Sequence, residues 1–162
     1  MLNYNQALPK DTLIQDLQMK EIKPIMKLII RGKKREFISA VGKSLNILLP
    51  IETNTSTQSD KLTAVWLSPD EWMIYSNEPG DENTNNYETE EILNNYISKL
   101  NLGAITDVTD QFVMINLKGN KIYELFKTGS PFNFNDFQNK NGAVIQTILN
   151  KVDIIVHNHN KD

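Results

Sequence analysis

Residues 104–134, AITDVTDQFVMINLKGNKIYELFKTGSPFNF, carry the pattern on which the fold of this chain depends. Apolar side chains dominate Gln111–Lys118 and alternate between two faces, which predicts a β-strand. A glycine then turns the chain, and Asn120 is placed to cap a helix. In that helix the apolar residues recur three and four positions apart, at Ile122, Leu125 and Phe126. Pro131 follows the helix and prevents it from continuing.

The order of strand, glycine and helix occurs twice in the chain. It is found in MKLIIRGKKREFISAVGKSL, residues 26–45, and again in FVMINLKGNKIYELFKTG, residues 112–129. Each copy is followed by a loop and two strand-like segments, at residues 62–76 and 143–158. The sequence therefore predicts an α+β fold of two β-α-β-β units, with mixed or antiparallel sheets and helices on one face of each.

The two units set the predicted domain plan. One α+β domain, residues 23–162, consists of two similar halves, residues 23–103 and 104–158. An N-terminal arm of residues 1–22 precedes it. In this arm Leu13, Ile14 and Leu17 either form a helical turn or pack the arm against the domain.

A helix is predicted at the end of the first unit, over Thr89–Leu100, with Thr89 as its cap. The second unit has no matching helix before Asp162. We expect either that a partner covers the corresponding surface or that this chain is a shortened version of the fold.

Composition restricts the possible functions. The 162 residues include no cysteine, which excludes disulfides, thiolate nucleophiles and iron–sulfur ligation. The formal net charge of −3 gives no general reason to expect nucleic acid as a partner. The N-terminus has no basic start followed by an apolar core, and no apolar run is long enough to cross a bilayer. These features predict a cytoplasmic location.

A basic loop is the candidate binding site for an anion. Its four cations lie where a strand gives way to a helix, at Arg31, Lys33, Lys34 and Arg35. A basic loop at a helix N-terminus can bind an anion, although these cations also oppose the helix dipole. The alternative interpretation is a solvated surface cluster. The lone Gly32 does not make a phosphate-binding loop or a dinucleotide fingerprint.

The remaining polar candidates have structural explanations. His157 and His159 have the spacing of a metal-binding pair but no evident third ligand, so no metal is expected. Two carboxylate pairs have turn chemistry to account for them, Asp107 with Asp110 and Asp70 with Glu71. Ser130 lacks the sequence context of a nucleophile, and no catalytic residue is predicted.

Candidate interface residues are Trp72, Pro131 and Phe132, while Trp66 is expected in the core. Tryptophan is enriched among the residues that dominate binding energy at protein interfaces, although Trp72 could equally be a core residue.

Several segments resemble the gamma subunit family of heterotetrameric sarcosine oxidase. AVWLSPDEWMIYS, residues 64–76, resembles that family's Trp-Leu-Gly-Pro-Asp-Glu-Trp hairpin. ITDVTDQFVMINLKG followed by LFKTGSPFNF resembles the family's run ending in Lys-Gly-Cys-Pro-Leu-Asp. IQTILNKVDIIVH resembles its Gln-Thr-Leu strand and the following hairpin, so that the likeness covers roughly Pro24–His157 in matching order.

The resemblance implies a fold related to the folate-binding domain of the glycine-cleavage T protein and of the YgfZ-like proteins. It also implies a non-catalytic subunit of a complex that oxidises sarcosine to glycine and hydrogen peroxide and passes a one-carbon unit to tetrahydrofolate. FAD, FMN, NAD and the folate site would then belong to the large subunits, and the partners would be the alpha, beta and delta chains.

The sequence departs from the family pattern in three places. Ser130 stands where the family tends to have cysteine, and Asn133 stands where it tends to have aspartate. A C-terminal strand and helix with an Arg-Ser-Phe-like motif is missing. Two alternatives to the sarcosine oxidase subunit are a stand-alone folate-binding module or small enzyme and the equivalent subunit of another N-methyl amine oxidoreductase.

Overall fold

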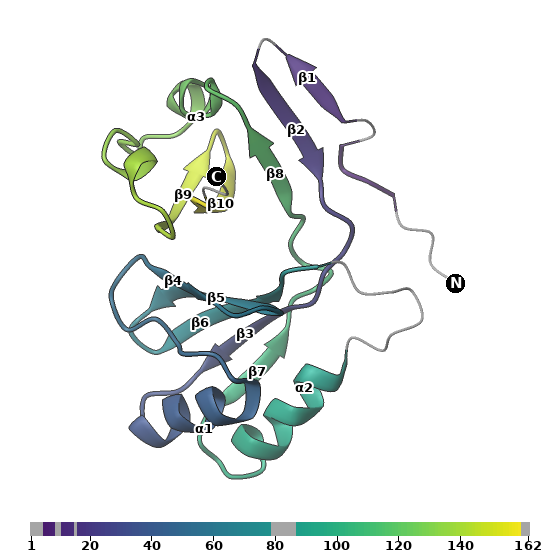
Figure 1. Cartoon of the computed structure of the whole chain (residues 1–162), viewed down its shortest axis with the longest axis vertical. Coiled ribbons are helices and arrows are strands. Elements are labelled where there is room, and N and C mark those ends of the chain that lie inside the picture. The colour runs from purple at the N-terminus through teal and green to yellow at the C-terminus, as the bar shows by residue number, and fades with distance from the viewer. Residues whose placement is uncertain (1–4, 9–10, 15, 79–86, 160–162) are drawn as a thin grey trace.

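The computed structural model of the protein describes residues 5–8, 11–14, 16–78 and 87–159. Their helices and strands are stacked in the order helix, sheet, sheet, helix (Figure 1). The first half supplies most of a five-stranded sheet with two helices on its outer face, whereas the second half supplies a two-stranded hairpin covered by one helix and a strand of a separate three-stranded sheet.

The first unit forms a five-stranded sheet. Its strand order is β4-β5-β6-β3-β7, and every neighbouring pair is antiparallel. A π-helical turn, Asn94–Ser98, continues the second helix of the unit. The elements in chain order are β3 (Lys27–Arg31), α1 (Arg35–Leu45), β4 (Ser56–Gln58), β5 (Leu62–Ser68), β6 (Glu71–Ser76), α2 (Tyr87–Leu93) and β7 (Ala104–Asp107).

Helices α1 and α2 cover one face of this sheet (Figure 1). Phe37 and Val41 of α1 are fully buried against apolar strand residues, as are Leu93 and Ile97 at the end of the unit. Full burial of side chains of this size stabilises by about 1.5–3 kcal/mol each, so this face is the main core.

The second unit is built around a hairpin. It comprises β8 (Ile115–Lys118), α3 (Ile122–Gly129), a 3-10 turn (Phe137–Asn139), β9 (Val144–Leu149) and β10 (Val152–His157). Strands β9 and β10 pair antiparallel, and one face of this hairpin packs on the five-stranded sheet through contacts such as Val144 and Ile155 with Val65 and Met73. The other face packs under α3 in an aromatic cluster that contains Phe126, Phe134 and Phe137.

The two units exchange strands. Strand β2 (Leu17–Glu21), which precedes the first unit, pairs antiparallel with β8 of the second unit. Strand β7, which precedes the second unit, pairs antiparallel with β3 of the first unit. The two additions are equivalent, and β1 (Thr12–Ile14) extends the β2 side to give the order β1-β2-β8 (Figure 1). Each unit therefore pairs its first strand with the strand that precedes the other unit, although the sheet of β2 and β8 is separate from the hairpin β9–β10.

The N-terminal residues differ from the sequence-based expectation. Thr12–Ile14 and Leu17–Glu21 are two strands of a hairpin, so of the two alternatives for this segment the helical turn is wrong. Leu17 is buried, whereas Leu13 and Ile14 are exposed, and this single inward residue explains why no clear pattern was visible. Asp16 has a left-handed φ of 67°, which turns the chain between the two strands.

Several element boundaries also differ. The strand predicted over Gln111–Lys118 begins only at Ile115, because the preceding residues turn after β7. Lys121, not Asn120, is the residue before helix α3, and no side chain caps that helix. Helix α2 begins at Tyr87, two residues before the predicted cap Thr89. A π-helical turn, Asn94–Ser98, follows α2, and Leu100 at the end of the predicted helix is 61% exposed.

Gly119 lies where the exchanged strand meets the second unit. Its φ is +122°, and a Cβ placed there would strike the backbone carbonyl of Asp16. We expect Gly119→Ala to destabilise the protein by ~2 kcal/mol or more, because alanine disfavours this φ and the clash is with backbone. Urea unfolding measures the loss, and hydrogen exchange should locate it in β1 and β2.

Gly42 provides the matched control. It lies inside α1, and an added Cβ would meet the backbone oxygen of Ile47 at an ordinary 3.5 Å. Gly42→Ala should therefore stabilise the protein by about 0.5–1 kcal/mol through helix propensity. Equal effects of the two substitutions would contradict the role given to Gly119.

Candidate functional site

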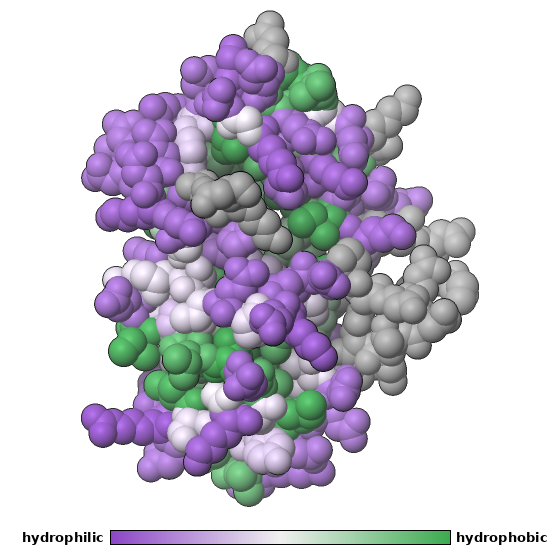
Figure 2. Space-filling model, viewed as in Figure 1, coloured by the Kyte–Doolittle hydropathy of each residue, from purple (hydrophilic) through white to green (hydrophobic). Residues whose placement is uncertain are grey.

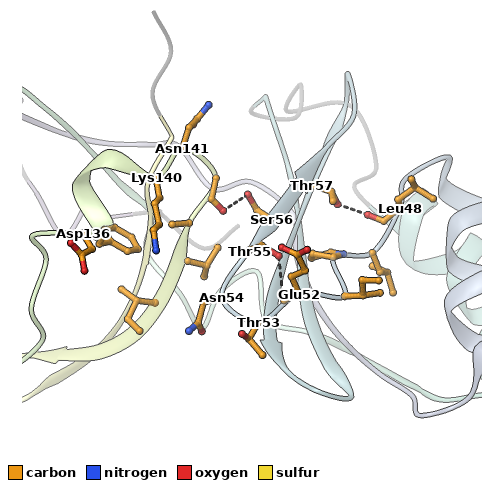
Figure 3. Close-up of a pocket in the computed structure, with 18 of the residues that line it drawn as sticks. Leu48, Glu52, Thr53, Asn54, Thr55, Ser56, Thr57, Asp136, Lys140 and Asn141 are labelled. Carbon is orange, nitrogen blue, oxygen red and sulfur yellow. Dashed lines mark hydrogen bonds between the residues drawn. The ribbon is translucent and has the colours of Figure 1, made fainter.

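A groove lies at the junction of the two units. Its volume is about 1260 Å³, and it is lined mainly by residues 48–57, the first wall, and by residues from 132–145, the second wall (Figure 3). The first wall belongs to the connection from α1 to β5, and the second belongs mostly to the connection from α3 to β9. These connections are equivalent in the two units, so the groove follows from the duplicated fold.

Hydrogen bonds join the two walls. The Ser56 hydroxyl donates to the backbone oxygen of Gly142 at 2.8 Å, the bond drawn between the walls in Figure 3. The backbone N–H of Val144 donates to the oxygen of Asn54, also at 2.8 Å. Gly142 has a φ of +77°, and a Cβ there would lie 3.1 Å from the Ser56 oxygen. The walls are therefore held at a fixed separation along this line.

The first wall is anchored from beneath. The indole N–H of Trp72 donates to the backbone oxygen of Pro50 at 2.8 Å, and the Thr57 hydroxyl donates to the oxygen of Leu48. Pro50 is buried, whereas Leu48 and Ile51 are 79% and 78% exposed. A fixed backbone thus presents two aliphatic side chains to solvent.

The second wall is held by one buried amide. Asn158 is 7% exposed, and its side-chain NH₂ donates to the backbone oxygens of Phe137, Gln138 and Lys140 at 2.9, 3.3 and 2.9 Å. Sharing two N–H groups among three carbonyls fixes the turn that carries the wall. Phe132 faces the groove from this wall, half-buried, and its ring meets Phe134 edge-on at 4.8 Å.

His157, on β10, connects the hairpin β9–β10 to the first wall and to the five-stranded sheet. Its Nε2 lies 2.9 Å from the Ser56 hydroxyl and its Nδ1 lies 2.7 Å from the Tyr75 hydroxyl. Burial raises the pKa of Tyr75 to about 12, so this hydroxyl keeps its proton and donates it to Nδ1. Since Ser56 donates to Gly142, it accepts from Nε2–H, and the histidine is neutral. Burial, aided by the neighbouring His159, lowers the pKa of His157 to about 4.

The low pKa of His157 predicts a loss of stability in acid. Its unfolded-state pKa is near 6.5, so between pH 6.5 and 4 only the unfolded chain gains this proton. The contribution of His157 is thus complete above pH 6.5 and is lost as pH falls toward 4. We expect about 2 kcal/mol of loss between pH 7 and 5 from this group. Urea unfolding should show this extra loss in the parent protein but not in His157→Gln.

The basic loop does not reach the groove. Arg31, Lys33, Lys34 and Arg35 are all exposed, and none of them lines either wall. Lys33 makes an ion pair at 3.8 Å with Asp70 of the hairpin turn, and the N–H of Gly32 donates to the Asp70 backbone oxygen. An acidic residue thus lies beside the loop. The role of these four cations as an anion site stays a prediction.

The carboxylate pairs are also separated from the groove. Asp107 accepts a hydrogen bond from the backbone N–H of Thr109, which is turn chemistry. Asp110 and Asp107 raise the pKa of Lys27, but the larger effect of burial lowers it. Lys27 is 2% exposed and donates to the backbone oxygen of Ile25. The Asp70 carboxylate accepts a hydrogen bond from the Ser68 hydroxyl at 3.0 Å, which is also turn chemistry.

The interface candidates lie in different environments. Trp72 is 2% exposed and stacks on Phe37 with ring centroids 5.8 Å apart, so it cannot contact a partner directly. Pro131 is exposed and Phe132 lines the groove, whereas Trp66 packs against the main core while remaining partly exposed. Ser130 hydrogen-bonds to Thr147 at 3.1 Å. Among the described residues no group of three His, Cys, Asp or Glu side chains could hold a metal ion.

Sequence reasoning missed the groove. Thr53–Lys61 has the composition of a loop. The sequence therefore gives no sign of the short strand β4, or of Ser56, which joins the two walls. The one available signal was the apolar run Ile47–Ile51, whose length is excessive for an exposed loop. Nothing local could have paired it with residues 132–145.

The fold defines a class, the duplicated α+β proteins whose halves exchange strands. Comparison then assigns the chain: the model of the sarcosine oxidase gamma subunit family matches residues 31–162, and the chain belongs to that family. The resemblance seen in the sequence is thereby confirmed, and with it the accessory gamma-subunit role.

Solved structures agree on the fold. A chain of the heterotetrameric sarcosine oxidase from Corynebacterium sp. U-96, determined in complex with pyrrole 2-carboxylate, superposes with a TM-score of 0.76 at 14% identity. The match covers 90% of this chain and 71% of that one. No curated protein sequence matches the chain. No helix among the described residues is long and apolar enough to span a membrane.

Proposed function

We propose that this chain is the non-catalytic gamma subunit of a heterotetrameric sarcosine oxidase, assembled with alpha, beta and delta subunits. The observation that carries the proposal is the family match over residues 31–162, which spans most of both units. In this assignment the complex demethylates sarcosine to glycine and passes the one-carbon unit to tetrahydrofolate. The equivalent subunit of another N-methyl amine oxidoreductase would have the same architecture.

The chemistry of the groove supports a non-catalytic role. The one serine–histidine pair at its edge is engaged in structure: the Ser56 hydroxyl donates to Gly142, and both ring nitrogens of His157 are hydrogen-bonded. A nucleophile needs a free hydroxyl facing a substrate and donors for the developing oxyanion. This pair instead fastens the second wall and the hairpin β9–β10 to the first unit.

We place FAD, FMN, NAD and tetrahydrofolate in the partner subunits. Gly32, the glycine beside the basic loop, does not cradle a phosphate, because a Cβ there would strike the ring of Phe37. Gly103 also approaches the Phe37 ring, at 2.7 Å from an added Cβ. These glycines serve close packing of α1 on the sheet. The cytoplasmic location stays a prediction.

Coexpression tests the proposal. An affinity-tagged chain, produced with the alpha, beta and delta subunits of the same organism, should co-purify with all three in a complex that oxidises sarcosine. The chain purified alone should be colourless. Failure of the tagged chain to retain the flavin-containing subunits would overturn the assignment.

The folate-binding alternative has a separate test. All four cations of the loop are exposed, and although Lys33 pairs with Asp70, the other three remain available to a polyglutamate tail. Titration of the isolated chain with tetrahydrofolate, followed by calorimetry, should give no heat if folate is held by another subunit. Saturable binding that Lys34→Glu with Arg35→Glu removes would favour the stand-alone module.

A further inference from the structure

The anchored backbone of the first wall holds two aliphatic side chains exposed to solvent. Leu48 and Ile51 are 79% and 78% exposed, while Ile47 and Leu49 beside them are only 4% and 5% exposed. The bond from Trp72 to Pro50 prevents this segment from rotating its outer residues inward. Single exposed apolar residues are common on protein surfaces, but two held close together beside a groove favour an interaction site.

The opposite wall adds an aromatic side chain to the lining of the groove. Phe132 faces the groove and is braced by the aromatic cluster under α3. The titratable side chains among the lining residues are Glu52, Asp136 and Lys140. Apolar and aromatic side chains together with a few charged ones are typical of a protein interface. Figure 2 shows apolar surface exposed below the middle of the molecule, between the five-stranded sheet and α1 of Figure 1.

The size of the groove favours a polypeptide over a small molecule. Its volume of about 1260 Å³ exceeds the roughly 300–1,000 Å³ of typical small-molecule sites.

We propose that this groove receives a segment of a large subunit of the complex, an inference that rests on the proposed function. The segment places apolar side chains between Leu48, Ile51 and Phe132. It also carries a lysine or arginine, because Glu52 and Asp136 outnumber Lys140 and leave the lining with a net negative charge. Trp72, the interface candidate of the sequence, acts here as a positioning residue from within the core.

Substitution of the two anchors tests the inference in the full complex. Leu48→Glu combined with Ile51→Glu should weaken association with the large subunits at least ~10-fold, measured by interferometry on the immobilised tagged chain. The matched control is Leu13→Glu combined with Val152→Glu, whose side chains are 76% and 64% exposed and do not line the groove. It should leave association within about twofold. Thermal unfolding of each isolated variant verifies that it is folded.

Charge reversal tests the stated chemistry of the partner. Glu52→Lys with Asp136→Lys should slow association severalfold, and Lys140→Glu should accelerate it, with both effects shrinking at high salt. Stronger binding by the double lysine variant would overturn the inference that the bound segment is basic. A photoreactive phenylalanine analogue at position 48 should crosslink to one large subunit and identify the segment.

The outcomes separate this inference from the proposed function. If the parent chain does not bind the large subunits, the proposed function fails. If the parent chain binds and the Leu48→Glu, Ile51→Glu variant binds equally well, only the groove assignment fails. If sedimentation shows that the isolated chain forms a dimer that the same variant dissociates, the occupant is a second copy and the inference is overturned.

Discussion

Replacing Trp72 by alanine is expected to lower the free energy of unfolding by about 3–5 kcal/mol, the usual range for a buried aromatic residue. The indole is 2% exposed, stacks on Phe37 and donates its N–H to the Pro50 oxygen. Its removal opens a cavity under α1 and also releases the first wall. Urea unfolding measures the loss.

Trp72→Phe separates the two contributions. It keeps most of the ring packing but loses the hydrogen bond, which alone is worth about 1 kcal/mol, so its stability should lie between the parent and alanine variants. Limited proteolysis should cut within residues 48–57 faster in both variants. Leu13→Ala, at a side chain 76% exposed, is the control and should change stability by less than about 0.5 kcal/mol. Unchanged proteolysis of Trp72→Phe would show that the wall does not depend on the indole N–H.

Phe134→Ala is expected to have an effect of similar size in the other unit. Phe134 is fully buried, and its ring stacks on Phe126 with centroids 5.0 Å apart and meets Phe132 edge-on at 4.8 Å. Truncation should cost about 3–5 kcal/mol from the lost burial and the cavity between α3 and the hairpin. Chemical unfolding should show the loss.

The location of this effect distinguishes it from that of Trp72. Hydrogen exchange in Phe134→Ala should increase in α3, β9 and the second wall before it increases in α1. Val152→Ala, at a side chain 64% exposed on the same hairpin, should be nearly neutral. Exchange that rises uniformly through both units would contradict a separate aromatic core.

The elements that were predicted from sequence are those with local signals. Helix α1 and the hairpins β5–β6 and β9–β10 have strong apolar periodicity and turn residues between their strands, and they occur as expected. Strand β4 was read as a loop because Ser56–Gln58 is polar, being an edge strand held partly by side-chain hydrogen bonds. Strand β4 exists because it pairs with Leu62–Ser68, and no local sequence pattern reveals that pairing.

The groove could not be predicted from sequence, because residues far apart in the chain form it. Ser56 contacts Gly142 and His157, which are 86 and 101 positions away. Composition did identify His157 as one of two histidines, but only the fold shows that its ring nitrogens are satisfied and its pKa is low. The family resemblance supplied the role, whereas the surface that could serve it required the structure.

The exchange of strands between the two units affects the order in which the chain can fold on the ribosome. Gln18 pairs with Lys118, and β3 must wait for Ala104–Asp107 before its outer edge is covered. At about 5–20 residues per second, the nascent β2 spends several seconds or more without its partner. A fragment ending at Gly103 would leave β3 open to aggregation, so the halves cannot be separated into independently expressed pieces.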